Sequence, residues 1–136
     1  MKFTTRQIVG VILWWTEGTK SRLDKRWKNS WSHNVEVTNT NPEMIKVFLD
    51  FLRKDIGIEE NNLKLQLQIH ENDDQKELER YWSNITKIPI SRFNKTIIRP
   101  EGKKVGKSKG TCKIRYTNKK TFHQINDLLQ KILNKI

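Results

Sequence analysis

The chain has 136 residues, a length that suits one domain built around one modest core. Its 27 Lys and Arg residues against 15 acids give a formal net charge of +12 and a pI of about 10.0, which favours a polyanionic partner. The longest apolar run, residues 8–15, is interrupted by Gly10 and is far shorter than the roughly 20 residues of a membrane-spanning helix. We therefore expect nucleic acid as the partner and no membrane.

The sequence also bears on the cellular compartment. The N-terminal residues lead into no signal-peptide pattern. Cys112 is the single cysteine, so it has no partner for an intrachain disulfide and no second thiolate for a zinc site. We expect a cytoplasmic, intracellular location, with a nucleoid or an organelle matrix as alternatives. The three histidines, His33, His70 and His123, show no metal-ligand spacing along the chain.

Most of the positive charge lies in two tracts. Residues 20–28 hold five basic residues and one acid, a net charge of +4, and residues 95–120 hold ten basic residues and one acid, a net charge of +9. Together they carry +13, so the rest of the chain is close to neutral at −1. Two basic tracts on a neutral domain indicate a localised phosphate-binding surface. The alternative is a pair of solvated basic loops that aid solubility.

Residues 5–17 are predicted to form a helix that is apolar nearly all round and ends at Gly18. A helix that is apolar on every side is buried on every side, so in a small domain it is expected to pack against a second chain. Residues 19–31 are interpreted as a basic excursion of strand and loop, and residues 33–38 as a short strand. The predicted interface of a homodimer comprises Gly10, Val11, Leu13 and Trp14.

The next helix and strand have clearer boundaries. Asn41 is suited to cap a helix that has Pro42 in its first position, and Gly57 is suited to end that helix. Residues 63–70 alternate between apolar and polar side chains, as a strand with one buried face does.

A further helix is expected to begin at Asp73 or Asp74 and to end before Pro89. Residues 99–110 are rich in Gly and Lys and offer almost nothing to bury, which predicts a flexible basic loop.

Residues 112–117 alternate again and predict a second half-buried strand. Asn118 is suited to cap the last helix, whose apolar stripe runs to Ile136. The order helix, strands, helix, strand, helix, strand, helix predicts an α+β layer with its helices packed on one face of the sheet.

The other face of that sheet is expected to be polar. It collects three side chains from each of three predicted strands: Asn34, Glu36, Thr38, Lys64, Gln66, Gln68, Lys113, Arg115 and Thr117. Arg and Lys suit guanine in the DNA major groove, and Gln or Asn suits adenine. The pattern favours base readout, and its alternative is a sheet face that is simply solvated. The residues expected to contact DNA are Lys20, Arg22, Arg26, Lys28, Lys64, Gln66, Gln68, Lys103, Lys104, Lys107, Lys109, Lys113 and Arg115.

The first predicted helix ends in an acid, Glu17, directly before Gly18. The helix dipole opposes a carboxylate at this end, and a bound divalent cation would compensate it. The alternative is an exposed Glu in a helix-ending turn. Residues 10–18, with the sequence GVILWWTEG, resemble the LAGLIDADG motif of homing endonucleases, and the final acid–glycine pair is the part that matches well. The order of the predicted elements over most of the chain is also similar to that of the family.

The resemblance implies a LAGLIDADG-like layer whose antiparallel, curved sheet straddles the major groove of double-stranded DNA. A single-motif chain of this family works as a homodimer, in which the motif helices pack together and their terminal acids bind divalent metal. The implied activity is phosphodiester cleavage with Mg²⁺ or Mn²⁺ as cofactor. Glu17 and Gly18 would form the metal site, Glu17 would be catalytic, and a lysine would assist, with Lys95 first and Lys119 second.

Three functions stay open on this evidence. The first is a site-specific DNA endonuclease. The second is the same fold without cleavage, acting as a DNA-binding regulator or an RNA-binding helper of intron splicing. Ile12 stands where the family has a small residue, and Trp14 and Trp15 are bulky, which favours this second function. The third is an RNA-binding, ribosome-associated protein, which the net charge alone permits.

Overall fold

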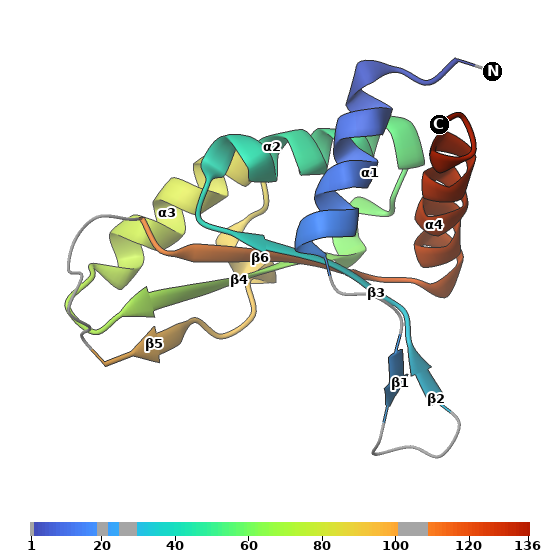
Figure 1. Ribbon diagram of the computed structural model, residues 1–136. Coiled ribbons are helices and arrows are strands. Elements are labelled where there is room, and N and C mark those ends of the chain that lie inside the picture. The colour runs from blue at the N-terminus through green and yellow to red at the C-terminus, as the bar shows by residue number, and fades with distance from the viewer. Residues whose placement is uncertain (1, 19–21, 25–29, 101–108) are drawn as a thin grey trace.

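The computed structural model describes residues 2–18, 22–24, 30–100 and 109–136 (Figure 1). It is an α+β fold, as the sequence predicts. In chain order the elements are α1 (Thr5–Glu17), β1 (Arg22–Asp24), β2 (Ser30–Ser32), β3 (Asn34–Asn39), α2 (Pro42–Asp50), the π-helix η1 (Phe51–Ile56), the 3₁₀ helix η2 (Glu60–Asn62), β4 (Leu63–His70), α3 (Gln75–Thr86), the 3₁₀ helix η3 (Ile90–Arg92), β5 (Ile97–Arg99), β6 (Thr111–Thr117) and α4 (Lys119–Leu133). Within these residues, no helix is long and apolar enough to cross a membrane.

The main sheet has the strand order β3-β6-β4-β5 among the described residues. Neighbours β3, β6 and β4 are antiparallel, whereas β5 runs parallel to β4. The sheet is therefore mixed, and the expectation of an antiparallel sheet is wrong at this edge. Strands β1 and β2 form a separate antiparallel ladder that projects beyond the main sheet from the start of β3 (Figure 1).

The described helices lie on one side of the main sheet, called here the helix side (Figure 1). Burial alternates along β4 and β6, so every second side chain is removed from water by the helices. Val37 of β3, Leu65 of β4 and Ile114 of β6 are fully buried there, together with Phe48 of α2 and Trp82 of α3. This layer confirms the predicted packing of helices on one face of the sheet.

Side-chain caps fix where the helices begin, because they bind backbone N–H groups that the first turn leaves unpaired. Asn41, Asp74 and Asn118 cap α2, α3 and α4, as predicted. Thr4 and Gln7 form a reciprocal capping box at the start of α1.

The second helix continues past Asp50 as the π-helix η1 and ends at Gly57, whose φ of 77° lies in the left-handed region. Glycine enters this region without the steric cost of a Cβ atom, so the predicted stop at Gly57 is confirmed.

Within one chain the first helix is buried on one side only, and its packing against a second chain stays a prediction. Contacts with α2, η1, β3 and α4 cover only one side of α1. Gly10, Val11 and Trp14 are buried inside their own chain, and Leu13 is half-buried against the same core. A Cβ atom at Gly10 would meet the ring of Phe51, so this glycine permits close approach within the chain. The exposed apolar side chains of α1 are instead Val9, Ile12 and Trp15.

The interpretation of residues 99–110 as a loop is wrong at its start. Arg99 ends β5, a three-residue edge strand that pairs with β4 over Gln68, Ile69 and His70. Residues 101–108 lie outside the described part of the chain.

Candidate nucleic-acid interface

The register of the main sheet brings the predicted polar side chains together on one face, called here the polar face. β6 lies between β3 and β4, and its residues align with both neighbours. Because paired residues in a ladder point to the same side, each aligned set forms a row across the strands. The rows are Glu36–Arg115–Lys64, Thr38–Lys113–Gln66, Asn34–Thr117 and Thr111–Gln68–Ile97. No described helix covers this face (Figure 1).

An acid lies at the centre of the polar face. Glu36 Oε1 is 3.2 Å from Nε of Arg115, and Glu36 Oε2 is 3.8 Å from Nζ of Lys113. The two cations cover the acid, so Glu36 is only 7% exposed although no helix lies over it. Arg115 and Lys113 keep about a third of their side-chain surface in water. The centre of the face therefore carries two cations and one carboxylate, a net positive charge.

The β4 side of the face is organised by amide groups. Gln66 donates a hydrogen bond of 2.9 Å from Nε2 to the backbone carbonyl of Lys95, which leaves its amide oxygen available as an acceptor. With its amide oriented to satisfy both groups, Gln68 accepts hydrogen bonds from the guanidinium of Arg99. A hollow of about 30 Å³ opens between these strands, lined by Thr38, Gln66, Gln68, Ile97, Thr111 and Lys113. It is large enough for a water molecule or a small projecting group.

Several predicted DNA contacts cannot be placed. Lys20, Arg26, Lys28, Lys103, Lys104 and Lys107 lie outside the described residues. Arg22 belongs to β1, and only its backbone is described. The hairpin that contains β1 projects beyond the sheet next to β3 (Figure 1).

Lys109 does not lie on the polar face. Its Nζ is 5.8 Å from the ring centroid of Tyr81 in α3, and its carbonyl accepts a hydrogen bond of 2.8 Å from Trp82 Nε1. Lys109 therefore ties the chain before β6 to α3 on the helix side. Contact of Lys109 with DNA stays a prediction. The position of Lys109 against α3 does not support it.

Glu17, the acid at the end of α1, lies at the outer edge of the main sheet, beside β3. Gly18 forms an antiparallel bridge with Val37, so α1 ends against β3. The Glu17 side chain is exposed and accepts a hydrogen bond of 3.4 Å from Nδ2 of Asn39. One carboxylate does not make a metal centre, and the described residues contain no group of three or more His, Cys, Asp or Glu side chains that could hold an ion.

Neither candidate lysine lies beside Glu17 within one chain. Lys95 follows η3 and contacts β4, which is separated from β3 by β6, a gap of about 10 Å between strand axes. Lys119 opens α4 beyond Asn34, at the other end of β3 from Asn39, roughly 17 Å along the strand. An assisting role for either lysine therefore requires a second copy of the chain to present Glu17.

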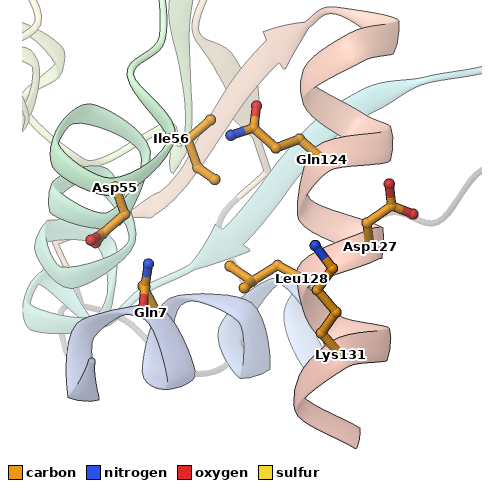
Figure 2. A pocket seen from close by; sticks show the side chains of 7 residues that line it. All are labelled: Gln7, Asp55, Ile56, Gln124, Asp127, Leu128 and Lys131. Carbon is orange, nitrogen blue, oxygen red and sulfur yellow. The ribbon is translucent and has the colours of Figure 1, made fainter. Parts of the chain in front are cut away.

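A second hollow, larger than the one between the strands, lies away from the polar face. It has a volume of about 270 Å³ and opens between α1, η1 and α4 (Figure 2). Its lining includes the apolar Ile56 and Leu128 and the charged Asp55, Asp127 and Lys131. Asp55 is already bound by Arg6 through contacts of 2.6 and 3.2 Å. Two carboxylates against one ammonium make this hollow a poor site for a phosphate.

Sequence reasoning missed two features of this surface. Arg99 was predicted to belong to a basic loop, because a strand of three residues is too short to show an alternation of apolar and polar side chains. Glu36 was treated as one polar residue among nine, although it is the acid that organises the central cations. The sequence did contain a signal for this role, because Glu36 stands between two valines, Val35 and Val37, that are buried in the structure.

Comparison of the chain with protein-family models, curated proteins and solved structures finds no match.

Proposed function

We propose that this protein binds double-stranded DNA through the polar face of the main sheet, with Lys64, Gln66, Arg115 and their neighbours facing base edges. The observation that carries the proposal is the register, which aligns these side chains in rows across β3, β6 and β4. Arg, Lys and Gln at neighbouring positions are the donors and acceptors that distinguish bases in the major groove. The net charge of +12 supplies the attraction for the phosphate backbone.

The composition of the polar face favours a duplex over a single strand. Proteins that hold single-stranded nucleic acid stack bases on aromatic side chains. The described residues of the polar face include no Phe, Tyr or Trp. Among duplexes, the major groove of DNA admits protein elements, whereas that of RNA is too narrow for side chains to read. Duplex DNA is therefore the partner that matches this face, and RNA is the alternative to test.

The resemblance of residues 10–18 to the LAGLIDADG motif supports a second step, metal-dependent cleavage of the bound DNA by a homodimer. Glu17 is exposed at the β3 edge, at the end of the helix that presents Val9, Ile12 and Trp15 to water. A second copy packed on this helix would bring a second Glu17 to the same edge. Mg²⁺ usually takes one or two protein carboxylates together with water and phosphate oxygens, so this pair fits its requirements. A bound Mg²⁺ would activate water and stabilise the leaving oxygen.

A library of randomised duplexes, incubated with the protein with and without Mg²⁺, tests both steps. The proposal predicts enrichment of related sequences in the bound fraction and cut molecules only when Mg²⁺ is present. An equal affinity for all duplexes, or a stronger affinity for RNA of the same sequences, would refute selective DNA binding. The matched pair Glu17→Gln and Glu43→Gln removes one negative charge each. Only the first should abolish cutting, while both should keep DNA binding; cutting by Glu17→Gln would refute the second step.

A further inference from the structure

Two of the three histidines lie side by side in the fold. His33 is the residue between β2 and β3, and His123 lies in α4, 90 positions later in the chain. Their ring centroids are 5.1 Å apart, and the ring planes are inclined by 52°. The third histidine, His70, ends β4, and its Nδ1 lies 3.9 Å from a carboxylate oxygen of Asp73. No spacing along the sequence marks the pair, because the fold alone brings these residues together.

The distance between the two rings matches that of two imidazoles on one metal ion. A metal–nitrogen bond of about 2.0–2.1 Å places each ring centroid roughly 3 Å from the ion. At a tetrahedral angle, two such rings have centroids about 5 Å apart. The separation of 5.1 Å between the ring centroids of His33 and His123 is therefore compatible with coordination of one ion by both rings.

The rings are held from one side and open on the other. Phe122 packs edge-on against both, with centroids 5.4 Å from His33 and 5.8 Å from His123. Phe122 itself is buried, so it forms a fixed wall of the core. His123 is exposed and His33 is half-buried, which leaves the pair accessible to an ion and to water. No hydrogen bond from a described residue occupies a ring nitrogen of either histidine.

The charges near His123 on α4 are mixed. Lys119 and Lys120 lie one turn before His123 and Asp127 lies one turn after it, so two positive charges and one negative charge flank it. The positive end of the helix dipole acts within the first turn of α4, and His123 lies beyond that turn.

We propose that His33 and His123 bind one divalent transition-metal ion of the class that prefers imidazole, such as Zn²⁺ or Ni²⁺. Water would complete the coordination, since the described residues add no third histidine, cysteine or carboxylate. The ion links the β2–β3 junction to the start of α4, and therefore fixes the base of the β1–β2 hairpin. Mg²⁺ does not bind there, because it requires oxygen ligands. This site is independent of the DNA-binding function and of Glu17.

Titration of the whole protein with Zn²⁺ and Ni²⁺, followed by calorimetry, tests the site. The expected result is one ion per chain, an affinity for either ion at least about 10-fold lower in His33→Ala and His123→Ala, and no change in His70→Ala. Retention of the wild-type affinity in the double variant His33→Ala/His123→Ala would overturn the proposal, as would an equal loss in His70→Ala.

A second measurement needs no substitution. Ni²⁺ added to the isotope-labelled wild type should broaden the NMR signals of residues around the β2–β3 junction and the start of α4 first. The signals of β4 near His70 should change only at higher Ni²⁺. Early broadening around His70, or none around His33 and His123, would contradict the site regardless of how the variants fold.

Discussion

The carboxylate of Glu36 lies 3.2 Å from Nε of Arg115, and both side chains stand on a sheet face that no described helix covers. Lys113 approaches the same carboxylate from the next row at 3.8 Å. In the free protein this acid holds the two central cations close to the sheet and offsets one of their charges. If the face binds DNA as proposed, Glu36 should control how strongly, and how selectively, it attracts the polyanion.

The substitution Glu36→Gln should strengthen binding to duplex DNA of any sequence and reduce the difference between preferred and other sequences. The reason is that Arg115 and Lys113 lose their shared anion, which raises the positive charge of the face and frees both side chains. Fluorescence anisotropy with several duplexes over a range of salt concentrations measures both effects.

The control for this prediction is Glu43→Gln in the first turn of α2 on the helix side, which changes the net charge by the same amount. It should leave the ratio of affinities unchanged. If both variants behave alike, Glu36 acts only through net charge, and its role on the polar face is wrong.

The substitution Gly10→Ala should lower the free energy of unfolding. A Cβ atom here would lie 2.2 Å from Cγ of Phe51, so one of the two elements must move, which costs about 1–3 kcal/mol. Helix propensity alone predicts the opposite, a gain of about 1 kcal/mol for Ala over Gly. Chemical denaturation measures whether the substitution lowers or raises the free energy of unfolding. A stabilised variant would contradict the packing of α1 on η1.

Self-association, where it occurs, should depend on the exposed side of α1. Ile12→Glu should give a folded monomer, because Ile12 is 43% exposed and its loss leaves the core intact. Val11→Glu should instead unfold the protein, because Val11 is fully buried. Sedimentation velocity together with circular dichroism separates these outcomes. A dimer that survives Ile12→Glu would place the contact between copies elsewhere.

Acid should destabilise the protein partly through Glu60. Its carboxylate accepts hydrogen bonds from Arg53 and Arg92, and the bond from Arg53 is the main cause that lowers the pKa of Glu60 below its ordinary value of 4.5. Because the pKa of Glu60 is lower in the folded protein than in the unfolded one, its ionised form stabilises the fold at pH values above the unfolded-state pKa. This stabilisation disappears as the pH falls through the folded-state pKa. Between about pH 5 and pH 3, Glu60→Gln should therefore lose less stability than the wild type. Glu59→Gln serves as the control and should follow the wild-type curve.

Alternation of apolar and polar residues was enough to predict β4 and β6, because these central strands bury one face under the helices. The caps of α2, α3 and α4 were equally predictable, since Asn and Asp bind the free N–H groups of a first turn. The polar face followed from the same alternation, because residues two apart on a strand point the same way.

Other features depend on contacts between distant segments. β5 is held by its parallel pairing with β4, and Ile97 and Ile98 look like any short apolar pair in the sequence. The composition of α1 showed that it is apolar but not which side its own chain covers, since that depends on Phe51 and the other residues it meets. The contact between His33 and His123 likewise exists only after β3 and α4 are packed together.

Duplex binding by two charge-matched double variants tests the polar face most directly. Gln66→Ala/Lys113→Ala removes one amide and one ammonium from the polar face, and Gln124→Ala/Lys131→Ala removes the same groups from α4. Because a base contact contributes about 1–3 kcal/mol, the first variant should bind its preferred duplex at least about 10-fold more weakly than the second. The second should stay close to the wild type. Equal losses in the two variants, or no loss in either, would contradict DNA binding by this face.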